Sequence, residues 1–121
     1  MSKDYFTFDE LKCKCGCGLM NFSPIVKSIL NNAREVAGIP FKISSACRCT
    51  KHNIVVGGSA TSSHLIGEAV DIVVTSEKDR YKILTSLLVV GFRRIGIGKN
   101  FIHVDNDLSK PLDIIWLYED K

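Results

Sequence analysis

The order of apolar and polar residues predicts two helices. After Ser23-Pro24, where a serine can cap a helix and a proline fits its first turn, apolar residues recur at helical spacing. They are Ile25, Val26, Ile29, Leu30, Ala33, Val36 and Ala37. Gly38 is a typical helix stop, so the first helix is expected over 24–37. The second is expected over about 77–90, after a Thr75 or Ser76 cap and before Gly91.

Shorter apolar stretches, bounded by turn-forming residues, predict strands. They cover residues 41–44, 68–74, 92–97, 101–105 and 114–118. Residues 45–63 contain Asn53, Gly57-Gly58 and a Ser/Thr cluster, so we interpret them as an irregular loop. Two helices beside a largely antiparallel sheet predict an α+β fold.

Alternation separates a polar from an apolar face in two of these strands. The apolar face, which must point to the core, holds Val70, Ile72, Val74, Ile102 and Val104. Asp71, His103 and Asp105 then share the opposite face. If the two strands are neighbours, these side chains start only about 5 Å apart. His64 would reach them from the preceding loop, with Gly67 relieving the backbone before the strand.

Two imidazoles and a carboxylate are a common zinc set that leaves a fourth position for water. We therefore predict a zinc site on one sheet face, with His64, Asp71 and His103 as ligands. Taken one at a time, a histidine or aspartate at such a position is more often a surface or hydrogen-bonded side chain than a ligand. His52 matches no ligand spacing and is expected to be a loop residue.

Size and composition fit one soluble domain over residues 1–121. The chain is 45% hydrophobic and 24% charged, with a formal net charge of +3. No Lys/Arg block marks a nucleic-acid footprint, and the apolar run Leu87–Val90 is far shorter than the about 20 residues of a membrane span. The N-terminus shows no apolar signal-peptide region. We expect a monomer made in the cytosol, with neither nucleic acid nor membrane as a partner.

The cysteines are odd in number, which argues against a complete set of disulfides. They are Cys13, Cys15, Cys17, Cys47 and Cys49. Alternate spacing would put neighbouring thiols on opposite sides of an extended chain, unlike the two-residue gap of a zinc knuckle. We expect reduced, partly buried thiols, with a second metal site or a redox pair as the alternative.

Several segments resemble the M15 family of zinc peptidases. Ser62-x-His64-x-x-Gly67-x-Ala69-x-Asp71 resembles the SxHxxGxAxD signature of that family, and Phe101–Asp105 resembles its second ligand segment. Ser44–Arg48, followed by Asn53 and Val56-Gly57-Gly58, is similar to the family's SGxR…N..VGG stretch. Phe8–Gly18 resembles the cysteine-rich lead-in of short, single-domain members. The resemblance covers residues 6 to 106.

The resemblance implies that His64, Asp71 and His103 hold Zn²⁺ and that Arg48 lies over the site. A guanidinium there can hold the substrate carboxylate or the developing oxyanion, whereas its structural alternative is a salt bridge that anchors the loop. Ser62 is expected to bind substrate or to orient the loop.

One position departs from the family pattern. Many members carry the general base as the Glu of an ExxH segment, and this chain has Asn100 there. Asp105 is our candidate for the base. Its alternative role is to orient a ligand imidazole. Glu68 is a second candidate, although alternation puts it on the face opposite Asp71.

The resemblance implies a zinc-dependent metallopeptidase that hydrolyses peptide bonds in peptidoglycan stem peptides, as a D,D-carboxypeptidase or an endopeptidase. It would act in phage lysis, as an endolysin released through a holin, or in cell-wall remodelling. A cytoplasmic dipeptidase also fits the absence of a signal peptide. Two alternatives come from other classes: a catalytically silent zinc-binding recognition module of the same fold, and a cysteine-centred redox or metal-sensing domain.

Overall fold

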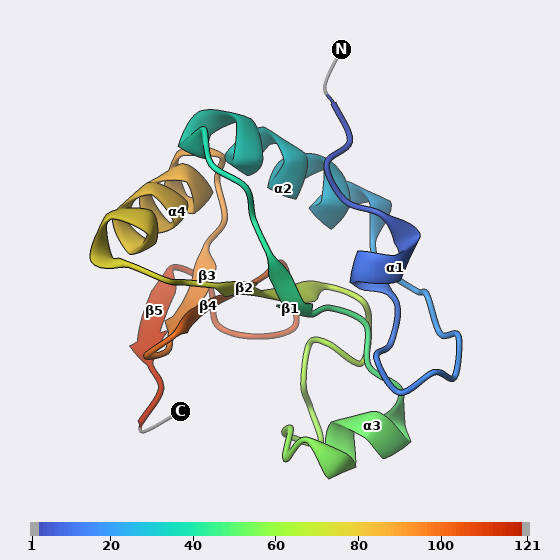
Figure 1. Cartoon of the computed structure of the whole chain (residues 1–121). Coiled ribbons are helices and arrows are strands. Elements are labelled where there is room, and N and C mark those ends of the chain that lie inside the picture. Colours follow the sequence, from blue (N-terminus) through green and yellow to red (C-terminus); the bar gives the residue numbers. More distant parts are fainter. Residues whose placement is uncertain (1–2, 120–121) are drawn as a thin grey trace.

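The computed structural model describes residues 3–119 and has two long helices packed on one face of a sheet (Figure 1). The long helices are α2 (Pro24–Ala37) and α4 (Glu77–Val89), and they lie side by side. The strands are β1 (Ile43–Ser45), β2 (Ala69–Val73), β3 (Arg94–Ile97), β4 (Phe101–Asp105) and β5 (Ile114–Leu117). Their order is β1-β2-β4-β3-β5, antiparallel except that β5 runs parallel to β3. The α+β prediction, with a largely antiparallel sheet, is confirmed.

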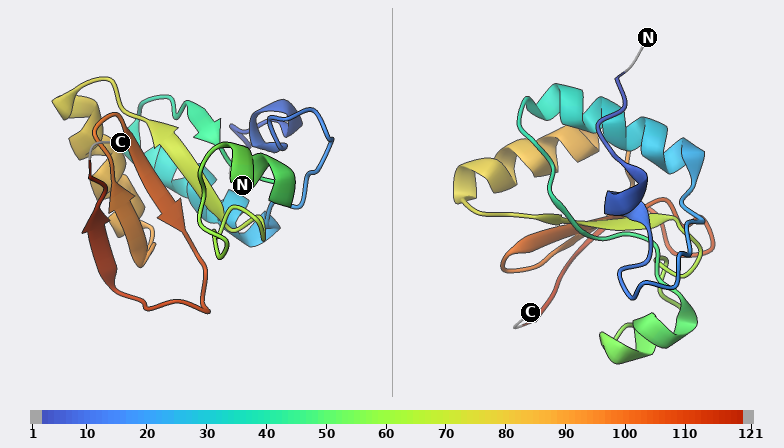
Figure 2. Two further views of the ribbon diagram at one scale, coloured as in Figure 1. Left: turned by 90° about the horizontal axis from the view of Figure 1, so that it is seen from below. Right: turned by 45° about the vertical axis from the view of Figure 1, so that its right-hand side comes forward.

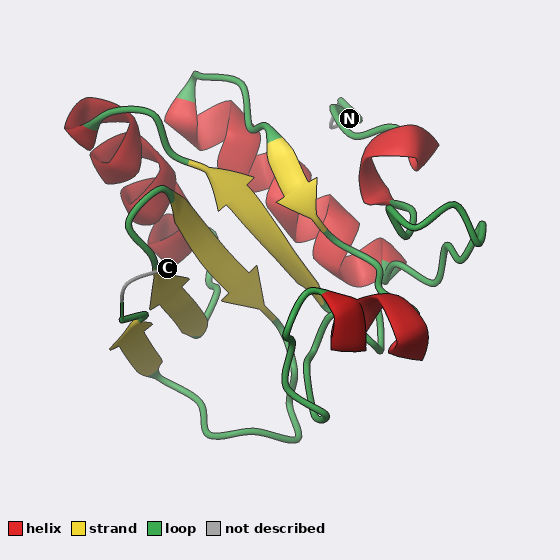
Figure 3. Cartoon of the chain, turned by 60° about the horizontal axis from the view of Figure 1, so that its bottom comes forward, coloured by secondary structure: helices red, strands yellow, loops and turns green. Residues whose placement is uncertain are grey.

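Two further helices are short. They are α1 (Phe8–Leu11) and α3 (Thr50–Val55), and α3 lies on the sheet face opposite the long helices (Figure 3). The prediction of an irregular loop over 45–63 is therefore wrong at α3, as is the placement of His52 in a loop. The six residues of α3 leave Ile54 and Val55 exposed, so they lack the buried apolar stripe that marks a helix in sequence. Its N-cap is Cys49, which is not a usual capping residue.

The core fills the space between the long helices and the sheet. Its fully buried side chains include Val26, Leu30, Ile83, Leu87, Val70, Ile72, Ile95, Ile102 and Val104. The apolar faces predicted for β2 and β4 are thus confirmed, and the other face of these strands is left for polar chemistry. Of the helices that the structure describes, none is long and apolar enough to cross a membrane.

Strand register sets which polar side chains meet. β2 and β4 pair antiparallel with Asp71 opposite His103 and Ala69 opposite Asp105. The loop that carries His64 enters β2 through Gly67, whose φ of 71° lies in the left-handed region. A Cβ on Gly67 would also collide with the backbone carbonyl of Asn21. Only glycine satisfies both conditions, so this turn fixes how the loop reaches the sheet.

Candidate metal centre

His64, Asp71 and His103 converge on the polar face of the sheet. One ligand atom from each of them lies within 4.8 Å of the others. Asp71 Oδ1 is 2.9 Å from His103 Nδ1 and 3.3 Å from His64 Nε2. His64 and His103 are buried, and the donor set matches an open zinc site with three protein ligands. The predicted meeting of these residues is confirmed.

The second nitrogen of each imidazole is held by a fixed partner. His64 Nδ1 is 2.7 Å from the backbone carbonyl oxygen of Ala46, and His103 Nε2 is 2.8 Å from Asp105 Oδ2. Both partners are acceptors, so a neutral ring that donates its proton there presents its other nitrogen, the one beside Asp71, to a metal ion. Metal-binding histidines are commonly held in this way. The arrangement fits a metal ion at the point where the three side chains meet.

Asp105 is one of the most deeply buried charged groups of the chain, with 1% of its surface exposed. Its Oδ1 accepts hydrogen bonds from Arg94 Nε at 2.7 Å and from the backbone N–H of Asp107 at 3.1 Å. Its Oδ2 accepts from His103. Since both oxygens are engaged, these contacts favour the second of the two roles considered for Asp105, orientation of a ligand imidazole.

The pKa values of Asp71 and His103 are set by the contacts between the side chains of the site. Burial alone would raise the pKa of Asp71, but hydrogen bonds with His103 and His64 hold it well below its ordinary value. Burial lowers the pKa of His103, and its contacts with Asp105 and Asp71 outweigh that effect and raise it. Asp71 is therefore ionised and available as an anionic ligand.

Arg48 lies at the edge of the site and makes three side-chain contacts. Its Nε donates to Ser45 Oγ at 3.0 Å, its Nη1 to Asn53 Oδ1 at 3.2 Å and its Nη2 to Asp71 Oδ2 at 3.4 Å. The guanidinium is thus held in one orientation beside the candidate ligands. Ser62 Oγ accepts a hydrogen bond from the backbone N–H of His64 at 3.2 Å, so it orients the ligand loop.

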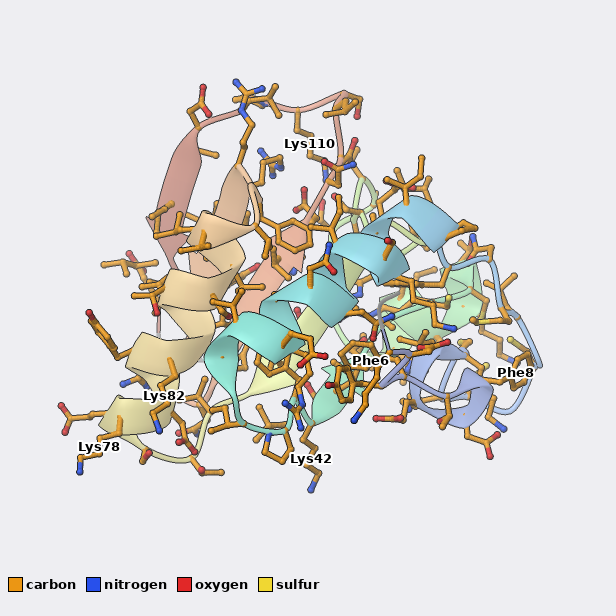
Figure 4. The ribbon with its side chains drawn as sticks, turned by 90° about the horizontal axis from the view of Figure 1, so that it is seen from above. Phe6, Phe8, Lys42, Lys78, Lys82 and Lys110 are labelled. Carbon is orange, nitrogen blue, oxygen red and sulfur yellow. The ribbon has the colours of Figure 1, made fainter. Side chains whose placement is uncertain are left out.

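The site opens into a cleft of about 310 Å³. Its walls include four residues that the sequence did not single out: Arg94, Lys110, Trp116 and Tyr118. Lys110 comes from the loop between β4 and β5, at the opposite end of the molecule from Lys42 and Lys78 (Figure 4). This loop and α3 flank the polar face of the sheet (Figure 2, left).

The two aromatic residues of the cleft wall lie beside His103. The Trp116 ring centroid lies 5.5 Å from that of His103. Trp116 and Tyr118 are two residues apart, at the spacing of one strand face. That signal was present in the sequence, but the parallel pairing of β5 with β3 that brings this face to the cleft was not.

The other residues considered from sequence lie elsewhere. Glu68 faces a separate hollow that also contains Ser23 and Asp107. Asn100 is exposed in the turn between β3 and β4. His52 in α3 does not line the cleft.

The thiols of Cys13, Cys15, Cys17 and Cys49 form a second group whose sulfur atoms all lie within 4.8 Å of one another. The expectation that alternate cysteines point to opposite sides is wrong, because the segment is folded into turns rather than extended. The described residues therefore contain two candidate metal sites, one with nitrogen and oxygen donors and one with sulfur donors.

Comparison with protein-family models gives a match to the family described as Peptidase M15, over residues 4–105. The matched segment contains all three candidate ligands and the four clustered cysteines. No curated protein matches the chain.

Proposed function

Because this chain belongs to the peptidase M15 family, we propose that it is a zinc-dependent metallopeptidase that hydrolyses peptide bonds in peptidoglycan stem peptides. The observation that carries the proposal is the convergence of His64, Asp71 and His103 with both remaining ring nitrogens held by acceptors. When bound, zinc supplies an activated water and a Lewis acid for the scissile carbonyl group.

In this proposal, Asp105 and the Ala46 carbonyl hold the two imidazoles in the tautomers that bind metal. Asp105 acts through His103. Burial raises the pKa of the Asp105 carboxyl group, but hydrogen bonds with His103, the backbone N–H of Asp107 and Arg94 outweigh it and keep the group ionised. Asp71 and Asp105 are the carboxylates among the described cleft residues. The alternative role of Asp105 as general base is therefore tested separately, with the Asp105→Asn variant.

Arg48 would bind either the free carboxylate of a stem peptide or the oxyanion that develops on the carbonyl. Its three existing contacts support this role, since a fixed guanidinium loses little rotamer freedom on binding an anion. Ser62 lines the same cleft and would bind the peptide while it holds the His64 backbone.

The charge of the cleft supports an anionic substrate. Arg48, Arg94 and Lys110 face two carboxylates, Asp71 and Asp105. Stem peptides carry carboxylates at their ends and side chains, and the formal net charge of +3 suits an anionic wall. Both a D,D-carboxypeptidase and an endopeptidase fit this chemistry. The biological setting would be phage lysis or cell-wall remodelling.

The test is incubation of the zinc-loaded protein with purified peptidoglycan, followed by measurement of new amino groups and by mass spectrometry of the products. Release of free D-alanine indicates a carboxypeptidase, and shortened or separated stem peptides indicate an endopeptidase. The His64→Ala variant should abolish release. His52→Ala is the matched control, because it removes an imidazole outside the cleft.

Retention of metal with no bond cleaved in any stem peptide would overturn the proposal. That result would favour a zinc-binding recognition module, which the replacement of the ExxH glutamate by Asn100 makes a specific second candidate.

A further inference from the structure

The cysteine cluster brings together two segments far apart in the chain. Cys13, Cys15 and Cys17 lie between α1 and α2, whereas Cys49 caps α3. The Cys15 sulfur is 3.5 Å from that of Cys13 and 3.6 Å from that of Cys49. These separations exceed a disulfide bond of about 2.05 Å, and the thiols are free.

The local backbone is shaped to gather these thiols. Gly16 and Gly18 have φ values of 89° and 83°, in the left-handed region that other residues rarely adopt. The backbone N–H of Cys13 donates to the carbonyl of Leu19 at 2.9 Å and closes the turn. The glycines that alternate with the cysteines thus convert an extended spacing into a loop with its sulfur atoms on one side.

Backbone donors also point at the sulfur atoms. The N–H of Cys49 is 3.4 Å from the Cys13 sulfur, and the N–H of His52 is 3.3 Å from the Cys49 sulfur. Such bonds stabilise a thiolate, which is the form that binds metal.

We propose that Cys13, Cys15, Cys17 and Cys49 bind one structural Zn²⁺ ion, separate from the His64–Asp71–His103 centre. Four Zn–S bonds of about 2.3 Å place tetrahedral sulfur ligands about 3.8 Å apart, close to the two separations above. Binding releases the thiol protons to solvent and needs no oxidant or reductant. The proposal is independent of the peptidase activity.

The ion would join the N-terminal segment to the loop that carries Arg48. Arg48 precedes Cys49 directly, and the backbone N–H of Cys47 donates to the carbonyl of Leu11 at 3.0 Å. Zinc at the cluster would therefore fix the backbone directly next to Arg48, whose side chain is already held by its contacts with Ser45, Asn53 and Asp71.

The test is metal analysis of protein purified under reducing conditions and supplied with zinc. Wild-type protein should hold two zinc equivalents, one for each candidate site. Cys15→Ser should lose the zinc of the cysteine cluster and keep the other zinc. His64→Ala should keep the zinc of the cysteine cluster and lose the other. Cys47→Ala is the matched control and should keep both, because its buried sulfur lies outside the cluster.

Cobalt substitution gives a second measurement that does not require a cysteine variant to fold. Wild-type protein and His64→Ala should both show thiolate-to-cobalt charge-transfer absorption, and a thiol-specific mercurial should release the zinc of the cluster. One zinc equivalent that is lost in His64→Ala and unaffected in Cys15→Ser would overturn the proposal. So would iron as the bound ion, or disulfides among these four cysteines in freshly reduced protein.

Discussion

Asp71 lies directly opposite His103 on neighbouring antiparallel strands, and its Oδ1 is 2.9 Å from the imidazole Nδ1. His64 approaches the same oxygen from the loop before β2, at 3.3 Å. Two of the three candidate ligands are therefore set by sheet register and the third by a turn. Substitutions of the groups around these side chains should reveal how much each group contributes to zinc binding, activity and stability.

The Asp105→Asn variant separates the two roles considered for this carboxylate. If Asp105 orients His103, zinc should bind about 10- to 100-fold more weakly, as competition with a chelator would measure. If Asp105 is instead the general base, kcat should fall while zinc affinity stays at the wild-type level. Asp113→Asn is the matched control, because Asp113 is exposed, pairs with Arg93 and has a φ of 60° that asparagine tolerates.

The Arg48→Lys variant tests whether the guanidinium acts on substrate. Lysine keeps the charge but cannot hold the fork-shaped contacts with Ser45, Asn53 and Asp71. We expect kcat/KM to fall about 100-fold with zinc content unchanged. An unchanged kcat/KM with a lower melting temperature would reduce Arg48 to an anchor of its loop. Arg93→Lys, at an exposed ion pair, controls for the substitution itself.

The Gly67→Ala variant should destabilise the protein more than Gly38→Ala. Both glycines have nearly the same φ, 71° and 70°, so each variant pays the left-handed penalty of about 1–2 kcal/mol. A Cβ at Gly38 meets open space, whereas one at Gly67 collides with the Asn21 backbone. Urea unfolding of the two variants gives the difference. Equal losses would mean that the Asn21 segment moves aside freely.

Protonation of Asp107 should lower the stability of the folded protein at acidic pH. Burial raises the pKa of Asp107, but hydrogen bonds from Ser109 and Ser63, with the nearby Lys110 charge, lower it to about 2. A folded-state pKa below the unfolded value of about 3.9 stabilises the protein above pH 4, by about 2 kcal/mol. This contribution is lost as the pH falls from about 4 to about 2.

The Asp107→Asn variant should therefore be less stable than wild type at pH 7, and the difference should shrink below about pH 3. Chemical unfolding at a series of pH values measures it. Asp9→Asn, which alters an exposed carboxylate, is the matched control. A constant difference across the series would assign the loss to packing rather than to charge.

The sequence predicted the long elements because their signals are local. The helices α2 and α4 start and end within one residue of the ranges expected from cap, periodicity and stop. Alternation in β2 and β4 correctly separated the apolar residues that face the core from Asp71 and His103. These features depend on the period of each element and need no knowledge of distant contacts.

The features that the sequence did not predict depend on contacts between segments far apart in the chain. No local pattern brings Cys49 to the thiols of the N-terminal turn, and none shows that β5 pairs with β3 so that Trp116 and Tyr118 reach the cleft. The helix α3 is short and has no buried stripe, so its sequence resembles a loop. The Arg94–Asp105 ion pair likewise needed the strand pairing of β3 and β4 to be seen.

The acceptor that holds His64 belongs to the main chain of Ala46, not to a side chain. No point mutation at that position can delete it, and evolution can exchange small residues there without disturbing the histidine. A protein engineer who wished to retune the basicity of His64 would have to move the backbone between β1 and α3. The other histidine differs in this respect, because a single base change in the codon for Asp105 is enough to alter its support.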